Sequence, residues 1–305
     1  MLQTFESQPT VSTLENQFST WLANHGKRGH GHSQNSIDAY LSDVRGFSRW
    51  FEPHAGQSFS ADLIISKDLH DYFTFSTEEE RVSAATWNRR RISLALFCQF
   101  TLENGMAAYN VFQGVPVMEK QKCAPKSLNK SDYLKLLRRV EQAANTARSD
   151  HQRFLAIRNR AMISLMVYAG LRVGELCALR ADDLLLSDRK GEVKIRDGKG
   201  NKSGDVPLGR EARIALVDWL KVSSGEMVFG GITERQVQRV VAEIGGMAGI
   251  EIHPHMLRHT FVYNILQQTG NLVIAQQLAR HSKIEQTARY AMPHQEDLER
   301  AVENI

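Results

Sequence analysis

Cysteine is scarce in this sequence: only Cys98, Cys123 and Cys177 occur, and no two of them stand in CxxC spacing. This scarcity argues against a disulfide framework and against a zinc site built from thiolates, and it fits a reducing compartment. Long hydrophobic runs are also missing, since no window approaches the roughly 18 apolar residues that a membrane helix needs. The opening MLQTFESQPT lacks the charged start and apolar stretch of a secretory leader. We therefore expect a cytoplasmic protein that uses no membrane.

An excess of charge is nearly absent as well. The net charge is only +4 over 305 residues, which permits a polyanionic partner without requiring one. We find no internal repeat and no low-complexity tract. Hydrophobic residues make up 42% of the chain and charged residues 24%, the balance of a globular protein, and the length exceeds that of most single domains. The sequence thus predicts two domains, and the placement of the charges has to indicate the partner.

Residues 1–115 predict an all-helical domain. In NSIDAYLSDVRGFSRWF, apolar side chains recur three and four positions apart, as on one face of a helix. In TWNRRRISLALFCQFTLENG they occupy more than one face, as in a helix packed on two sides. Residues 116–127 form a linker, because Pro116 breaks the helical pattern. Four lysines lie in or beside this linker: Lys120, Lys122, Lys126 and Lys130.

Residues 128–305 predict a second domain, helical with a small antiparallel sheet. A helical pattern ends at Gly170, a residue suited to the left-handed backbone at a helix C-terminus. Three apolar or alternating runs, at 184–186, 192–196 and 206–208, are separated by turn-rich DRKG and DGKGNKSG, as in a meander. Helical patterns continue to the final QEDLERAVEN. The fold class expected for the chain is mainly α with a small antiparallel β-sheet.

Residues 253–261, HPHMLRHTF, concentrate three histidines and an arginine. A zinc-protease helix needs HExxH, but Met256 stands where the glutamate should follow His255, so a metal site is disfavoured. The ordinary interpretation of an isolated HxxRH is a polar helix start whose histidines bond to local backbone. His255 and Arg258 share one helix face, however, and a planar guanidinium beside an imidazole suits a phosphate.

Other segments offer further ligands for an anion. In AGLRVGELCALR, Arg172 follows a glycine-terminated helix and begins another, so its guanidinium lies beside backbone N–H groups that favour an anion. RHSKIEQTARY then adds His281 and Tyr290 close to the end of the chain. Taken singly, each of these residues is more often a packed or solvated side chain; together they suggest a site.

These segments closely resemble the tyrosine recombinases, the phage-integrase family that includes the Xer-type chromosome-dimer resolvases. The resemblance runs from about residue 15 to the end, and four blocks occur in the family's order: GLRVGEL, GKGNKSGDVPL, HPHMLRHTF and RHSKIEQTARY. It implies a helical SAM-like core-binding domain and a mixed α/β catalytic domain that close on DNA as a C-shaped clamp. The catalytic residues carried over from the four blocks are Arg172, Lys199, His255, Arg258, His281 and Tyr290, with Glu175 in a supporting position.

The chemistry implied is attack of the Tyr290 hydroxyl on a DNA phosphodiester, giving a 3′-phosphotyrosyl intermediate and a free 5′-hydroxyl. Arg172 and Arg258 are suited to hold the nonbridging oxygens bidentately. A phenol with a pKa of about 10 needs a proton acceptor, and His255 is the candidate; Lys199 is the candidate acid for the leaving oxygen. The expected cofactor set is empty, without metal or ATP, because the bond energy is retained in the intermediate.

Binding of DNA needs more surface than the catalytic residues. Cations near the start of a helix are disfavoured by its dipole, so Arg89, Arg90 and Arg91 are candidate ligands of backbone phosphate, or else a solvated charged face. The linker lysines are further candidates. The resemblance also implies a homotetramer on two duplexes, a Holliday junction, exchange of the C-terminal helix between protomers, and room for DNA-bending proteins or a partner recombinase.

The sequence departs from the family pattern at Arg280, which stands at a common glycine position in LARHSK. Arg280 either reshapes this turn or adds a DNA contact. Two alternatives to a recombinase remain: a type IB topoisomerase, which would share the tyrosine, arginines and lysine, and a DNA-binding regulator without activity. The intact set of six residues disfavours the regulator. The biological task, among dimer resolution, phage integration and transposon resolution, is not encoded in these residues.

Overall fold

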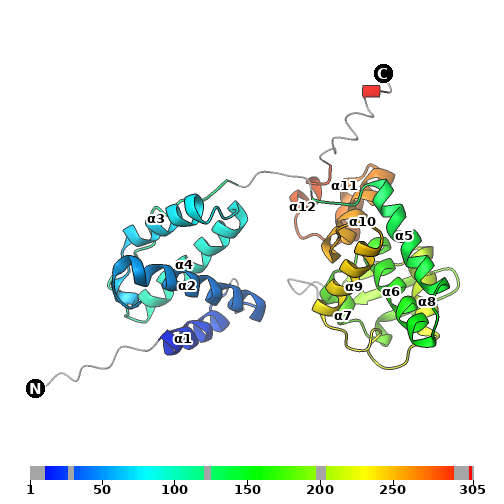
Figure 1. The fold of residues 1–305 in the computed structure, drawn as a ribbon, viewed down its shortest axis with the longest axis horizontal. Helices are drawn as coiled ribbons and strands as arrows, with labels where there is room; N and C mark the ends of the chain where they lie inside the picture. The colour runs from blue at the N-terminus through cyan, green and yellow to red at the C-terminus, as the bar shows by residue number, and fades with distance from the viewer. Residues whose placement is uncertain (1–10, 27–30, 120–124, 197–203, 292–301, 304–305) are drawn as a thin grey trace, which may run out of the picture. The chain divides into compact units, whose positions relative to one another are not determined.

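The computed structural model describes residues 11–26, 31–119, 125–196, 204–291 and 302–303. It divides the chain into two compact units, Met1–Gln121 and Lys122–Ile305, and each has its own hydrophobic core. The predicted fold class, mainly helical with a small antiparallel sheet, is confirmed (Figure 1). Among the helices of the described residues, none is long and apolar enough to cross a membrane.

The first unit is a helical domain around an aromatic core. Phe18, Phe47 and Phe97 are almost completely buried, and the rings of Phe18 and Phe97 meet edge to face with centroids 5.3 Å apart. The two-sided apolar pattern seen in the sequence belongs to α4, which packs against both α1 and α2. The helices of this unit are α1 (Val11–Asn24), α2 (Gln34–Ala55), η2 (Ala61–Leu63), α3 (Ser66–Thr74), η3 (Phe75–Glu79) and α4 (Ala84–Glu103).

The second unit is built around α6, whose residues 161–167 are all buried. Helices α5, α8 and α10 pack on α6, and Figure 1 shows α5 and α8 beside it. The helices are α5 (Lys130–Asn145), α6 (Asp150–Tyr168), α7 (Val173–Cys177), η4 (Ala181–Asp183), α8 (Arg210–Leu220), α9 (Glu234–Met247), α10 (Pro254–Thr269), α11 (Leu272–Ala279) and α12 (Ile284–Ala288).

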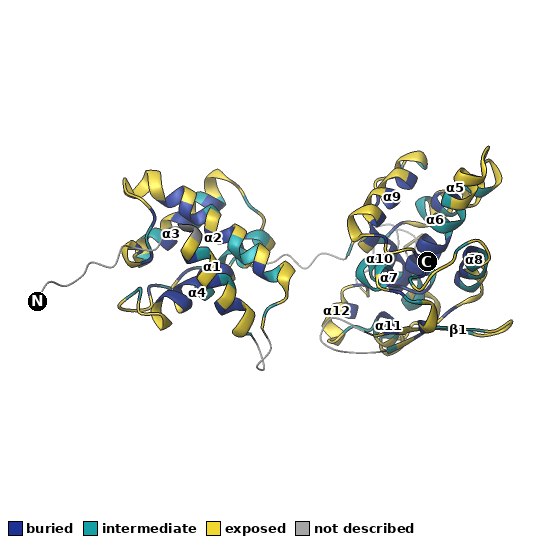
Figure 2. Cartoon of the chain, turned by 90° about the horizontal axis from the view of Figure 1, so that it is seen from below, coloured by how far each residue is buried: buried dark blue, intermediate teal, exposed yellow. Residues whose placement is uncertain are grey.

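The sheet of this unit is the predicted meander. Its strands β1 (Leu184–Leu186), β2 (Gly191–Ile195) and β3 (Gly204–Pro207) lie in sequence order and pair antiparallel. Val193 of β2 stands opposite Leu184 on one side and Val206 on the other. Val193 and Val206 are buried in the core of the unit, so alternation of side chains along β2 and β3 sets this register. Figure 2 shows the buried residues on the inner faces of the surrounding helices.

A small separate cluster lies between α10, α11 and the segment after α12. It contains Phe261 and Val262 of α10, Ala275 and Ala279 of α11, and Tyr290. Because the two alanines are small, α11 can approach α10 closely. The cluster therefore holds the ring of Tyr290 against the helix that carries His255 and Arg258.

Gly170, just after α6, tests this packing. Its φ is +63°, and a Cβ there would lie 2.3 Å from Cδ1 of Phe261. We expect Gly170→Ala to destabilise the protein by about 1–2 kcal/mol for the left-handed backbone plus roughly 1–3 kcal/mol for the overlap. Gly270→Ala is the matched control, since Gly270 has a φ of +61° and open space around it. Urea unfolding of both variants should show the larger loss at Gly170; equal losses would contradict the packing.

Candidate active site

Arg172 begins α7 and is fixed by Glu175 in the helix's first turn. Arg172 is the N-cap residue, and Glu175 stands at the third helical position. Oε2 of Glu175 accepts from the backbone N–H of Arg172 at 2.8 Å, and its Oε1 accepts from Nη1 of the same arginine at 2.6 Å. The carboxylate thus returns to the N-cap backbone, as in a capping box, while also holding the guanidinium. This contact gives Glu175 a cation to hold, while the supporting role that the resemblance implies for it stays a prediction.

Arg258 joins three helices from a buried position. Its side chain lies on α10, and the residue is only 4% exposed. Nη1 donates to the carbonyl of Gly170, just after α6, and Nη2 donates to the carbonyl of Ala279, the last residue of α11. Burial is the main cause that lowers the pKa of Arg258 to about 9, and the charges of Arg172 and Arg280 contribute to the same decrease. The charge of Arg172 thus disfavours a second positive charge at Arg258, as expected for two cations of one site.

The hydroxyl of Tyr290 is bound by His259. Tyr290 is 5% exposed, and its Oη hydrogen-bonds to Nδ1 of His259. The ring of His281 also lies near Tyr290, with ring centroids 6.2 Å apart and an interplanar angle of 20°. Nδ1 of His281 is in turn 2.8 Å from Oγ1 of Thr287. Tyr290 thus contacts two histidines, one on α10 and one after α11.

His255 lies one turn before His259 on α10. The centroids of the two imidazole rings are 6.0 Å apart. The hydroxyl of Tyr290 bonds to His259 and not to His255. His259 is the second histidine of HxxRH, a pattern that suggests a metal ligand or a bond to local backbone, so its contact with Tyr290 was not predicted. Its signal was present, because residues four apart share a helix face. Within the described residues, no three histidine, cysteine or acidic side chains gather as a metal site.

Burial keeps the rings of the site uncharged near neutral pH. It lowers the pKa of both His259 and His281 to about 4, assisted for His281 by the charges of Arg258 and Arg172. The pKa of His255 is lowered too, by burial and then by His253 and Arg258. Burial raises the pKa of Tyr290 to about 12, although Arg258 opposes the rise. The permanent positive charge of the site is therefore that of its arginines.

Arg280 points into the site. Its φ of 52° is left-handed, and glycine adopts this conformation most readily. The backbone therefore explains why glycine is common at this position in the family. Its side chain is 13% exposed, and Nη2 lies 2.5 Å from Oε2 of Glu175. The sequence suggested that Arg280 reshapes the turn or contacts DNA. Neither alternative predicted this ion pair with Glu175, because the two residues are distant in sequence.

The three arginines of α4 have partners inside their own unit. Nη1 of Arg89 is 2.5 Å from Asp43, Arg90 pairs with Glu80, and Nε of Arg91 donates to the carbonyl of Val115 at 2.9 Å. Arg89 and Arg90 therefore do not need an external anion to balance their charge, and their contact with DNA stays a prediction. Lys126 and Lys130 are exposed. Lys120, Lys122 and the predicted acid Lys199 lie outside the described residues, as do residues 292–301 of the predicted terminal helix.

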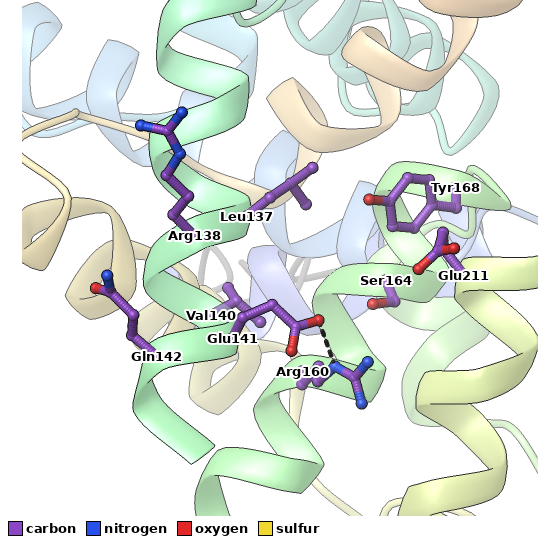
Figure 3. A pocket seen from close by; sticks show the side chains of 9 residues that line it. All are labelled: Leu137, Arg138, Val140, Glu141, Gln142, Arg160, Ser164, Tyr168 and Glu211. Atoms are coloured by element: carbon purple, nitrogen blue, oxygen red, sulfur yellow. Dashed lines mark hydrogen bonds and ion pairs between the residues drawn. The ribbon is translucent and has the colours of Figure 1, made fainter. Parts of the chain in front are cut away.

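A hollow elsewhere in this unit contains none of the predicted catalytic residues. Figure 3 shows it between α5, α6 and α8, with Glu141 paired to Arg160. Arg160 also binds Asp218 at 3.0 Å, so this arginine of the wall already has two acidic partners. The convergence of side chains, not the presence of a hollow, locates the candidate site.

Two family models match the chain. The model described as "Phage integrase family" matches residues 126–297, and the one described as "Phage integrase, N-terminal SAM-like domain" matches residues 16–105. Among curated relatives, tyrosine recombinase XerC of Xylella fastidiosa (strain M23) is 31% identical over 292 residues, covering 92% of each chain. Tyrosine recombinase XerD of Ralstonia nicotianae is 30% identical and covers 85% of this chain and 84% of its own.

Solved structures share the fold. The site-specific recombinase XerH bound to palindromic difH substrate, a post-cleavage complex, has a TM-score of 0.70 at 20% identity and covers 96% of this chain and 84% of its own. A lambda integrase tetramer bound to a Holliday junction has a TM-score of 0.69 at 18% identity, with 93% and 78% covered.

The buried histidines predict acid sensitivity. The pKa of His259 falls from 6.5 to about 4 on folding, so between these pH values the unfolded chain binds a proton that the folded chain does not. The resulting stability is complete above pH 6.5 and is lost as the pH falls toward 4. We expect His259→Gln to lose less stability between pH 7 and pH 5 in urea unfolding, whereas His151→Gln, at an exposed histidine of α6, behaves as the parent. Parallel curves for all three proteins would contradict the assignment.

Proposed function

The chain belongs to the phage integrase family and is a tyrosine recombinase, an enzyme that breaks and rejoins DNA strands; from this premise we propose that Tyr290 is its nucleophile. In the proposed reaction, Tyr290 attacks a phosphodiester at a specific site and forms a 3′-phosphotyrosyl link. The observation that supports this best is the gathering of side chains at Tyr290, which contacts His259 and His281. Arg172 reaches the carbonyl of Arg280, the residue before His281, and the charge of Arg258 opposes the rise in the pKa of Tyr290.

Arg172 and Arg258 are the proposed ligands of the phosphate. Each guanidinium has five N–H donors, and Arg258 uses donors of Nη1 and Nη2 for carbonyls, which leaves others for an anion. Arg172 is the more accessible of the two, with a side chain 27% exposed. As charge develops on the nonbridging oxygens in the transition state, donors that are already oriented stabilise it without reorganisation.

Proton transfers balance the proposed step. The bond between Oη of Tyr290 and phosphorus forms, the bond from phosphorus to the 5′-oxygen breaks, and the phenol proton leaves for a histidine. His259 already contacts Oη, and His255 is the acceptor expected from the sequence. Lys199 donates a proton to the leaving 5′-oxygen, and Glu175 supports Arg172. No metal, ATP or other cofactor enters the balance, since rejoining reverses the same bonds.

We propose the rest of the assembly from the family. Residues 1–115 bind DNA as a core-binding domain, 116–127 link it to the catalytic domain 128–305, and the two domains clamp the duplex. Exposed Lys126 and Lys130 suit backbone phosphates, which give affinity with little sequence choice. Four protomers on two duplexes, with an exchanged C-terminal helix, pass through a Holliday junction. The proposed location is the cytoplasm of a prokaryotic cell.

Tyr290→Phe tests the nucleophile. We expect this variant to bind a nicked suicide site with the parent's affinity but to form no covalent protein–DNA adduct, because only the attacking oxygen is removed. The adduct is measured by denaturing gel electrophoresis before and after protease treatment. An adduct of normal yield would remove Tyr290 from this role.

A separate assay on the parent protein distinguishes a recombinase from a topoisomerase. Only a recombinase joins strands between two duplexes.

Lys199→Ala tests the acid. We expect the variant to cleave an ordinary site poorly and to regain cleavage when sulfur replaces the 5′-bridging oxygen, because a thiolate leaves with little need of a proton. Adduct formation is timed in single turnover on the two substrates. If the sulfur substrate is cleaved no better than the oxygen one, the leaving-group proton comes from elsewhere.

A further inference from the structure

We propose that Arg280 is a positioning residue of the cleavage site, which through Glu175 holds the guanidinium of Arg172 in the orientation that receives the phosphate. This inference rests on the proposed function, in which Arg172 is a phosphate ligand. It assigns a role to a side chain at a position where the resemblance leads one to expect glycine, which could not make any of the side-chain contacts below.

The first contact is the shared carboxylate. Oε1 of Glu175 accepts from Nη1 of Arg172 at 2.6 Å, and Oε2 lies 2.5 Å from Nη2 of Arg280. The side chain of Glu175 is only 5% exposed, so water competes little for its oxygens. Because each oxygen is taken by a different guanidinium, a rotation of the carboxylate that frees Arg172 also breaks the pair with Arg280. The second arginine thereby restrains the first.

Further contacts tie Arg280 to neighbouring elements of the site. Its carbonyl lies 3.4 Å from Nη2 of Arg172, and its own Nη2 lies 3.5 Å from the carbonyl of Gly170, which also accepts from Arg258. Its Cδ lies 3.5 Å from where a Cβ of Gly204 would stand, at the start of β3. Arg280 therefore connects the end of α11 with the end of α6, with α7 and with the sheet.

The backbone adds an independent observation. Arg280 ends α11 with φ 52° and ψ 43°, a conformation that L side chains adopt rarely and glycine freely. The side-chain contacts of Arg280 are thus made from a backbone conformation that is energetically unfavourable for an L-residue. The same geometry makes Arg280→Gly a clean variant, because glycine relieves the backbone while removing every side-chain contact.

The pH dependence of cleavage distinguishes this role from one in packing alone, because it depends on the pKa of Glu175. Burial acts to raise the pKa of Glu175. The charge of Arg280, together with the backbone N–H and the charge of Arg172, outweighs burial, so the pKa of Glu175 lies below its ordinary value. Three arginines, Arg172, Arg280 and Arg258, act on this carboxyl. The other charged residues that line the same hollow as Glu175 are Arg180, Asp183, Lys194 and Arg196. Without Arg280 the pKa of Glu175 rises. Activity that requires the carboxylate is then lost at a higher pH as the solution is acidified.

The experiment compares Arg280→Gly and Arg280→Lys with the parent in single-turnover cleavage of a suicide site across pH. We expect Arg280→Gly to keep its DNA affinity, to cleave about tenfold more slowly or worse, and to lose activity at a higher pH on the acid side. Arg280→Lys, which keeps a charge but not the planar fork, should lie between them. In a Glu175→Gln background the effect of Arg280→Gly should largely disappear, since the two residues act together.

Arg81→Gly is the matched control. Arg81 also has a left-handed φ, 51°, but it is exposed in the first unit, so its variant reports the backbone effect alone and should cleave like the parent. Parental cleavage and pH profile in a folded Arg280→Gly protein would overturn the inference. If Arg280→Gly failed to fold, parental kinetics in Arg280→Lys would do so. Absence of any adduct from the parent chain would instead refute the proposed function.

Discussion

The candidate site depends on a buried guanidinium that binds the ends of two helices. Arg258 donates to the carbonyl of Gly170, just past α6, and to that of Ala279, the last residue of α11. Carbonyls at helix C-termini lack intrahelical partners and carry partial negative charge, so they can stabilise a cation that burial would otherwise penalise. One side chain thus satisfies two helix ends and places α10, α6 and α11 around one point.

A surplus of positive charge surrounds that point. Arg172, Arg258 and Arg280 all act on the carboxylate of Glu175, and the pKa of Arg258 is depressed partly because the other two are near. Such an arrangement favours an additional anion, and a phosphodiester provides one. The histidines contribute little charge near neutral pH, since burial lowers the pKa of His259 and His281 to about 4. They are suited to exchange protons with Tyr290 rather than to bind the anion by charge.

Local sequence predicted what short-range patterns determine. Arg172 could be placed at a helix start because Gly170 ends the helix before it, and the meander followed from turn-rich segments. His259 was missed because its partner, Tyr290, arrives from a distant segment, and that approach is set by the packing of α11 on α10. The partners of Arg280 and Arg89, Glu175 and Asp43, are likewise remote in sequence. Charge patterns along a helix therefore could not show that Arg89 and Arg90 have acidic partners within the protein.

The most direct test of the account is a crystal structure of the Tyr290→Phe chain with a duplex that contains its site. The account predicts one phosphate whose nonbridging oxygens lie about 3 Å from nitrogens of both Arg172 and Arg258, with the ring of Phe at position 290 facing the same phosphorus. A phosphate that contacts neither arginine, or two phosphates divided between them, would contradict it.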